Sequence, residues 1–440
     1  MRHNELHNAA LLQRINRRLE PGGDRRPAVI PGGSGPGGVR AQVIAGLESK
    51  VSLLQVASGG IKKTQAWLNE MDRFLEEAKS PRAQEPLAPT VANRFIEDRL
   101  GQIQMITSAV SFSGQALLNG KSGVLGRADG AGLQFVKGSA RTRSSQGRGY
   151  PVAIEWGPKS ASLMGNAPLN PSEIQKEAWI GFKEGGAEAR YKVRGDEQPK
   201  ELVARLQESV DRAGLDLSVY LTRDMRLLIL SNRLGSGPRF EGVSQKTRLI
   251  SSRAGEGVLA EPGRDINGQI GTEPAQGQGG FLIGAPGNAR TDGLKLYYDG
   301  EAQYPGQIVG YVEVVQKGLL VPMDLETKEV EILSLPALGP ELLAVGIKNP
   351  SGFKSLGQIR AGSQVERRDA QKLVAQARGE LSDLAEELKW KEEVYVGRAT
   401  DLLKAGFEPR PTGADLLGLS QDKAKIMASQ LRGILDHPVA

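Results

Sequence analysis

The chain has 440 residues, with 57 Lys and Arg, 51 Asp and Glu and a formal net charge of +6. Its length predicts about two to four domains, and so mild a charge excess argues against a dedicated nucleic-acid binder. The lack of cysteine excludes a disulfide scaffold, a thiol nucleophile and any zinc site that needs Cys.

The three histidines, His3, His7 and His437, stand at the two ends of the chain. A Ser-His-Asp triad, a His-paired nucleophile or an HExxH metal site would have to be built on these termini, whereas such sites are normally held on rigid elements. We therefore expect no enzyme, no catalytic residue, no cofactor and no metal.

Residues 1–40 predict an N-terminal segment and a flexible linker. The opening segment carries Arg and Glu through its only apolar stretch, and no run of 18 apolar residues occurs anywhere. We expect no membrane span and no cleavable signal peptide. Pro and Gly recur throughout residues 21–38, which disfavours both a helix and a packed strand.

Residues 41–120 predict an N-terminal helical core of two helices. The first begins near Ala41 and stops before Pro81, and its apolar residues follow steps of four and three. The second begins near Thr90 as N-cap and ends at Asn119-Gly120. The positions of the two apolar stripes are Leu47, Val51, Leu54, Ile61, Leu68, Leu75, Ile96, Leu100, Ile103 and Val110.

Between residues 121 and 355 the sequence predicts a β-rich insert, because short alternating stretches are separated by Gly and Asn turns. The expected strands are 188–193, 216–220, 226–230, 294–298 and 308–315, with one amphipathic helix at 199–213.

Residues 356–410 predict a C-terminal helical core, and residues 411–440 a terminal helix. The stripe over 361–404 again has the spacing of a coiled coil and includes Leu381, Leu384 and Leu388. The predicted fold is α+β: long antiparallel coiled-coil-like helices from both termini pack together, and a β-rich middle region is inserted between them.

One local pattern lies within residues 172–244. A strand pair leads into a helix whose apolar face is Leu202, Leu206 and Val210, and two strands follow with a turn at Arg223-Asp224. From the residues alone this is a small ββαββ module of an ordinary α+β kind. The pattern also resembles the flagellin hook IN motif, and the matching residues are Leu206, Val210, Ala213, Gly214, Leu228, Leu230, Ser231, Asn232 and Gly235.

A second pattern covers residues 263–300 and is similar to a glycine-rich stretch of flagellar cap and flagellin variable domains. We expect its glycines to be turn and bulge residues with positive φ. A phosphate loop at GQGGF is not expected, because neither a preceding buried strand nor a following helix with Lys is present. The matching residues are Gly263, Asp265, Gly268, Gly277, Gly279, Leu282, Gly284, Gly287, Gly293, Leu294 and Tyr298.

The ends of the chain resemble flagellin as well. Leu12, Arg18, Leu19 and Gly22 match the flagellin opening, and Leu118-Asn119-Gly120 matches the close of its second helix. Two features depart from the family: the PGGSGPGG run replaces a Ser/Asn/Asp-rich turn, and the C-terminal segment lacks the usual Gln/Asn-rich composition.

The resemblance implies a structural subunit of a bacterial flagellar filament that self-assembles through its terminal helices for swimming motility. It implies an extracellular protein, secreted without a cleavable signal peptide. Its partners would be copies of itself in a helical filament, hook-associated and cap proteins, and the flagellar export chaperone and export apparatus, with no nucleic acid and no membrane insertion. The residues expected to pair between subunits are Leu12, Ile15, Leu19, Ile426, Leu431 and Leu435.

Two alternatives stay open: a hook-associated or filament-cap protein, and a non-polymerising flagellin-like binding module. Adjacent carboxylates such as Glu386-Glu387 point about 100° apart on a helix, so we interpret them as solvated faces. The four tryptophans are expected to be core or helix-packing anchors, at Trp67, Trp156, Trp179 and Trp390.

Overall fold

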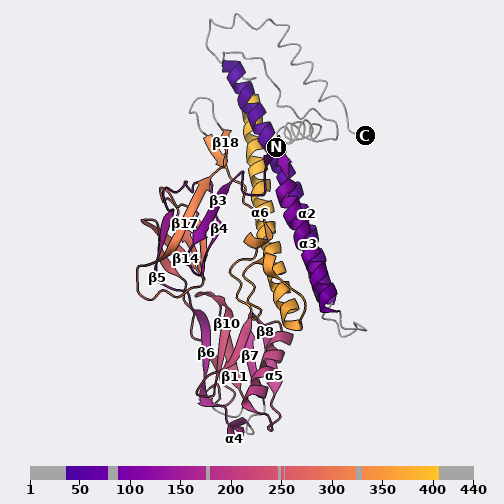
Figure 1. The fold of residues 1–440 in the computed structure, drawn as a ribbon, viewed down its shortest axis with the longest axis vertical. Coiled ribbons are helices and arrows are strands. Elements are labelled where there is room, and N and C mark those ends of the chain that lie inside the picture. Colours follow the sequence, from indigo (N-terminus) through magenta and orange to yellow (C-terminus); the bar gives the residue numbers. More distant parts are fainter. Residues whose placement is uncertain are drawn as a thin grey trace, which may run out of the picture.

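The computed structural model describes residues 36–77, 88–174, 179–245, 249–251, 253–323 and 330–405. The protein is α+β, with long helices at both ends of the described chain and a large β-rich region between them. The molecule is elongated: the helices run along one side, a curled sheet flanks them, and a smaller body occupies the lower end (Figure 1). In the described ranges, no helix combines the length and the apolar character needed to cross a bilayer.

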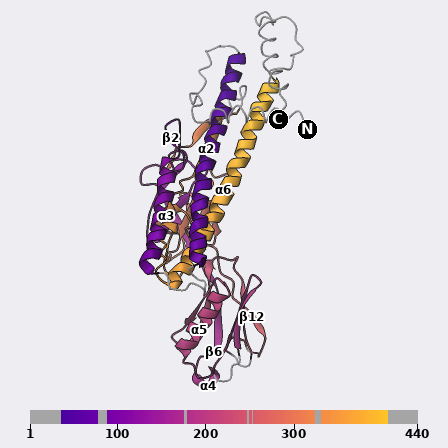
Figure 2. The same ribbon diagram turned by 90° about the vertical axis from the view of Figure 1, so that its right-hand side faces the viewer.

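The longest elements are the helices α2 (Pro36–Glu77) and α6 (Gln364–Ala405), which lie side by side (Figure 2). Gln55 Nε2 donates to Glu392 Oε1 over 2.8 Å, and Gln371 Nε2 donates to Glu76 Oε2. The residue numbers along one helix rise as those along the other fall. The two helices are therefore antiparallel, and α2 begins at the end of the pair where α6 finishes.

The start of α2 differs from the sequence prediction. The helix begins at Pro36, inside the predicted linker 21–38. Proline suits the first turn of a helix because its missing N–H would have no intrahelical acceptor there, and its fixed φ is already helical.

The helix α3 (Pro89–Ala109) packs on the opposite side of α2 from α6. It ends at Ala109, so the predicted continuation to residue 120 is wrong. The predicted N-cap is also wrong, because Ala88 occupies that position and Pro89 follows it within the first turn. Residues 111–116 instead form a tight hairpin of β1 (Ser111–Phe112) and β2 (Gln115–Ala116).

A close approach explains why α3 stops. A Cβ on Gly60 would lie 2.8 Å from Val110 Cγ2 and 2.8 Å from Leu118 Cδ1. The hairpin returns the chain to α2, so that Leu117 and Leu118 are fully buried. Burial of these two leucines favours the turn.

The curled sheet has eight antiparallel strands around its own apolar core. The first and last strands in the sheet order, β3 and β4, are consecutive in the chain and lie in contact, which curls the sheet around that core. Its strands, in sheet order, are β3 (Val124–Asp129), β17 (Gln307–Gln316), β5 (Tyr150–Trp156), β13 (Asn267–Ile270), β14 (Glu273–Gln278), β15 (Phe281–Gly284), β16 (Lys295–Tyr298) and β4 (Leu133–Lys137).

The smaller body, residues 160–261, is called the module below. It has a three-stranded and a four-stranded sheet, with α5 (Pro199–Arg212) packed on β8 and β9 and a short α4 (Pro171–Ile174). The first sheet is β6 (Ser160–Pro168), β10 (Arg226–Leu234) and β9 (Leu217–Leu221); the second is β12 (Gly257–Leu259), β11 (Phe240–Ser244), β7 (Trp179–Glu184) and β8 (Ala187–Lys192).

All five predicted strands occur, as β8, β9, β10, β16 and β17, and the predicted helix occurs as α5. Leu202, Leu206 and Val210 form its buried face. The hairpins before and after α5 nevertheless belong to different sheets, which the interpretation as one ββαββ unit did not anticipate. The second neighbours are β6, which precedes the first hairpin and pairs with β10, and β11, which follows the second hairpin and pairs with β7.

Residues 319–361 return the chain from the curled sheet to the helices. A hairpin of β18 (Leu319–Pro322) and β19 (Val330–Leu333) lies against α2, and two short 3₁₀ turns follow, η1 (Pro340–Leu342) and η2 (Leu356–Gln358). This segment belongs to the same apolar core as the helices.

Candidate assembly site

The helical core, formed by α2, α3 and α6, holds the positions that the sequence marked for helix packing. Ten of them share one buried cluster with 0–1% exposure: Leu47, Val51, Leu54, Ile61, Leu68, Leu75, Ile96, Ile103, Leu381 and Leu388. Leu100, Val110 and Leu384 pack against this cluster and are half-buried. The stripes are therefore used inside one subunit, which leaves them unavailable for contacts between subunits.

The contact of α3 with α2 combines apolar and charged groups. The rings of Phe74 and Phe95 stack with their centroids 4.1 Å apart. Arg99 lies over the Phe95 ring at 4.8 Å and places Nε 2.8 Å from Glu70 Oε2. Stacked rings and a partly desolvated cation fix the position of α3 beyond what apolar area alone provides.

Sequence reasoning missed the contribution of residues 333–361 to this core. The most buried apolar residues of the segment that belong to this core are Leu333, Leu335, Leu338, Leu343, Ala344, Leu356, Ile359 and Ala361. The signal was present as a leucine-rich stretch in EILSLPALGPELLAVGI. Because its prolines and glycines interrupt any helical or strand period, only the composition of the stretch indicated burial.

The tryptophan prediction is wrong at two of four positions. Trp67 packs against the helical core, and Trp179 is half-buried beneath the Arg190 guanidinium, whose carbon lies 4.3 Å from the ring centroid. Trp156 is 43% exposed, and Trp390 on α6 is 61% exposed. Neither of these two exposed rings is a packing anchor in the core.

Charged side chains join the module to α6. Lys372 Nζ lies 2.7 Å from Asp216 Oδ1, and Arg368 pairs with Asp211. Asn232, a residue of the IN-like pattern, donates its Nδ2 to Asp216 Oδ1 and its backbone N–H to Asp216 O, at 3.2 and 2.9 Å. The motif residue thus orients the carboxylate that meets the helical core.

The other residues of that pattern separate into two faces. The helix positions Leu206 and Val210 are buried, and Gly214 has a φ of 71° that ends α5. On β10, Leu227 and Ile229 are buried, whereas the motif positions Leu228 and Leu230 are half-buried on the other face.

The glycine-rich pattern at 263–300 is held by carboxylates. Asp265 Oδ1 accepts the backbone N–H of Gly279 at 2.7 Å, and its carboxylate also accepts the Ser236 hydroxyl. Burial alone would raise the pKa of Asp265, but the hydrogen bonds from Ser236 and Gly279 outweigh it and lower that pKa. Glu273 holds Thr291 in the same way, with Thr291 Oγ1 2.6 Å from Glu273 Oε2.

Positive φ explains only part of the glycine pattern. Gly279, Gly287 and Gly293 have positive φ, as expected. At Gly277 the reason is close packing, because a Cβ there would lie 1.6 Å from Ile266 O. An added Cβ would also lie within 2.2 Å of a backbone oxygen at three other glycines of the pattern, Gly263, Gly268 and Gly284.

The described ranges contain no group of three His, Cys, Asp or Glu side chains that could hold a metal ion. The residues expected to pair between subunits lie outside the described residues, as do the predicted terminal helix 411–440 and the three histidines. These residues are Leu12, Ile15, Leu19, Ile426, Leu431 and Leu435.

Several solved structures that resemble this chain in part are flagellar structural proteins. FliC from Burkholderia pseudomallei is 13% identical, and the alignment covers 80% of this chain and 99% of that chain at a TM-score of 0.28. The flagellar hook associated protein-3 from Legionella pneumophila is 10% identical, with coverages of 97% and 99% and a TM-score of 0.27. The D2-D3 domains of the flagellar cap protein FliD from Escherichia coli are 9% identical, with coverages of 44% and 99% and a TM-score of 0.29.

No protein-family model matches the sequence, and no curated protein matches it. TM-scores this low mean that the whole chains do not superpose. The residues and the geometry described above therefore carry the proposal that follows.

Proposed function

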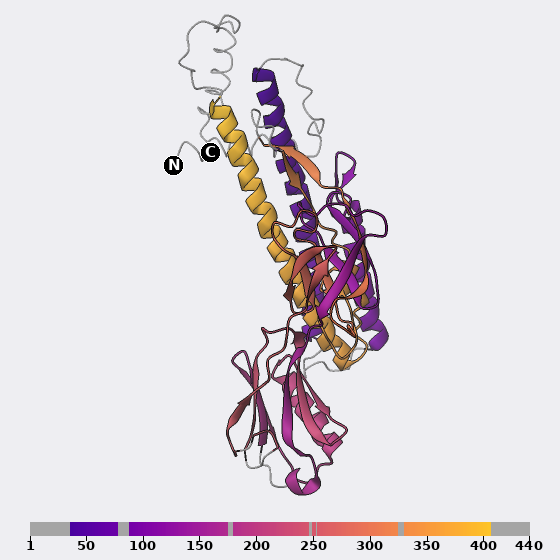
Figure 3. The ribbon, with the colours of Figure 1, turned by 90° about the vertical axis from the view of Figure 1, so that its left-hand side faces the viewer.

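We propose that this chain is a structural subunit of a bacterial flagellar filament, flagellin-like, that self-assembles through its terminal segments for swimming motility. One observation carries the proposal. The start of α2 and the end of α6 lie together at one end of the molecule, and the module lies at the other end (Figure 3). The chain therefore enters and leaves the helical core at the same place, where two terminal segments can act as one assembly unit.

The distribution of apolar residues supports this division of roles. Within the helical core, the leucine and isoleucine stripes are buried in the packing of α2, α3 and α6 of the same subunit. The terminal segments carry further apolar positions, Leu12, Ile15 and Leu19 before the core and Ile426, Leu431 and Leu435 after it. We propose that these pair between subunits as coiled-coil-like helices, with the β-rich part facing outward.

The same proposal sets the location and the partners. The subunit would be secreted without a cleavable signal peptide and would reside in the extracellular flagellum. It would contact copies of itself, hook-associated and cap proteins, and, before export, a flagellar export chaperone and the export apparatus.

The test is negative-stain electron microscopy of the concentrated full chain, seeded with sheared filament fragments. Two variants break the proposed contacts: Leu12→Glu combined with Leu431→Glu, and a version that lacks residues 1–35 and 406–440. Ile308→Glu is the matched control, because Ile308 is 53% exposed on the curled sheet, away from the termini. Filaments from the full chain and the control, but not from the two variants, support the proposal.

Monodisperse monomers from the seeded full chain would contradict a self-polymerising subunit. That result would favour the alternatives, a hook-associated or filament-cap protein or a non-polymerising flagellin-like binding module. Co-sedimentation of the monomer with filament ends would then separate the first alternative from the second.

A further inference from the structure

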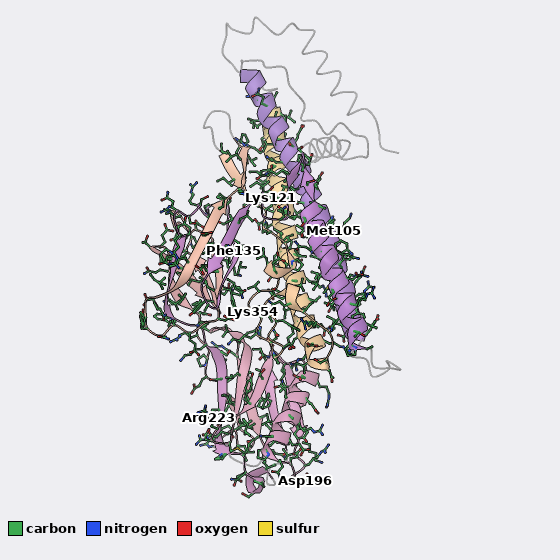
Figure 4. All side chains as sticks on the ribbon, viewed as in Figure 1. Met105, Lys121, Phe135, Asp196, Arg223 and Lys354 are labelled. Carbon is green, nitrogen blue, oxygen red and sulfur yellow. The ribbon has the colours of Figure 1, made fainter. Side chains whose placement is uncertain are left out.

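A cavity of about 320 Å³ lies where the module, the curled sheet and the loop before α6 meet. Its walls come from β9 and β10, from Tyr297 and Asp299 at the end of β16, and from residues 346–354. Lys354, a lining residue labelled in Figure 4, lies between the curled sheet and the module. We propose that this junction cavity binds one monosaccharide unit that carries a carboxylate, such as a hexuronate.

Two mostly buried residues of the cavity wall, Ser231 and Tyr297, carry hydroxyl groups. Ser231 is 2% exposed; its Oγ accepts the Arg233 N–H, while its own proton has no acceptor among the described residues. Tyr297 is 4% exposed and also lines the cavity. Burial raises the pKa of Tyr297, so the phenol stays protonated and can donate. Each of these hydroxyl groups can both donate and accept a hydrogen bond.

The neighbouring wall is held in place by its own hydrogen bonds. Ser218 Oγ lies 2.6 Å from Asn232 Oδ1, and Asn232 is tied in turn to Asp216. Both side chains are at least nine-tenths buried, which fixes their rotamers. A cavity with such a wall loses little conformational freedom when a ligand enters.

Aromatic and charged groups indicate the ligand class. Tyr220 is 48% exposed beside the cavity and Phe353 is 8% exposed in its wall, and such rings pack against the C–H face of a sugar. Two lysines among the lining residues, Lys348 and Lys354, are exposed, and Asp299 is the one carboxylate among them. The positive charge therefore favours a ligand that carries an anionic group.

The chemistry favours a sugar acid over a phosphate. Phosphate sites use arginine forks or the N–H groups of a helix N-terminus, and no arginine lines this cavity. Serine and tyrosine hydroxyls both donate and accept, which matches a ring of hydroxyls. The volume lies at the lower end of ligand pockets, about 300–1,000 Å³, which suits one sugar ring.

The test uses the unassembled full chain with glucuronate, followed by saturation-transfer NMR and calorimetry. Glucose, acetate and inorganic phosphate are the comparison probes. We expect glucuronate to bind with a Kd of about 1 mM and each comparison probe to bind at least about tenfold more weakly. The variants are Lys348→Gln with Lys354→Gln, and Tyr220→Ala; Lys200→Gln, an exposed lysine on α5, is the control.

Loss of at least about tenfold in glucuronate affinity in both cavity variants, with the control unchanged and all variants folded by circular dichroism, supports the proposal. Three outcomes overturn it: no glucuronate binding, equal binding of glucuronate and acetate or glucose, or binding that the cavity variants leave unchanged. None of these readouts depends on filament assembly.

Discussion

Lys372 of α6 places its ammonium group 2.7 Å from Asp216 Oδ1, the same oxygen that accepts a hydrogen bond from Asn232 Nδ2. The contact joins the helical core to the module through side chains that are each about a quarter exposed, at 26%. A pair with that exposure is partly screened by water, so it stabilises by no more than about 1 kcal/mol. Its role is to fix the orientation of the module.

We therefore expect Lys372→Met to leave the unfolding midpoint nearly unchanged while it loosens the junction. Hydrogen exchange at residues 214–218 and 230–233 should become faster, and high salt should produce the same change in the native chain. Lys389→Met, an exposed lysine on α6, is the control. Equal exchange in Lys372→Met and native protein would show that Lys372 does not hold the module.

The centre of the α2 and α6 contact should respond strongly to truncation. Leu54 is 0% exposed, and Leu54→Ala should lower the free energy of unfolding by about 2–5 kcal/mol, because it removes buried methyl groups and leaves a cavity. Guanidinium unfolding followed by far-UV circular dichroism measures the change. Leu320→Ala, at a side chain that is 65% exposed on β18, should change it by less than about 0.5 kcal/mol. Similar losses in both variants would contradict the buried helix pair.

The glycine at position 277 should tolerate no side chain. A Cβ there would meet Ile266 O at 1.6 Å, so Gly277→Ala must push β14 away from the segment that precedes β13 and should cost about 1–3 kcal/mol or more. Gly237→Ala is a matched control, since a Cβ at Gly237 has no atom within 4 Å. Thermal unfolding of the two variants compares them directly, and an unchanged Tm for Gly277→Ala would refute the close packing.

The carboxylate of Asp265 should make stability depend on pH. Its pKa lies below the ordinary value of 3.8 in the folded chain, so its contribution is fully present above about pH 4 and is lost as the pH falls through the folded pKa. Asp265→Asn should therefore be less stable than the native chain at pH 7 by about 1–3 kcal/mol, because charge-assisted hydrogen bonds are lost. The difference should shrink below pH 4 in denaturant titrations. A constant difference from pH 7 to about pH 3 would contradict the lowered pKa.

Local periodicity was sufficient to find part of the fold: the long helices, α5 and five of the strands. The stripe from Leu47 to Leu75 and the alternation in β8, β9, β10, β16 and β17 each mark a buried face, and the structure buries them. The face of α5 was predictable for the same reason, since three apolar residues at helical spacing are enough to define it.

Pairing over long distances was not predictable. Strand alternation shows which side of β7 or β10 is apolar but not which strand lies beside it, so the division of the hairpins between two sheets had to come from the structure. The early end of α3 depends on Gly60, which lies far away in the sequence. The exposure of Trp390 depends on where α2 sits around α6.

The candidate sites divide in the same way. The sequence by itself determined that the helices carry apolar stripes, that Asn232 and Asp265 belong to recurring patterns, and that no histidine stands between residues 7 and 437. Only the tertiary structure decided what those residues contact: Asn232 orients the carboxylate that meets Lys372, and Asp265 holds the turn at Gly279. The physical reason is that a stripe or a turn follows from neighbours along the chain, whereas a hydrogen bond or a cavity wall requires segments that only folding brings together.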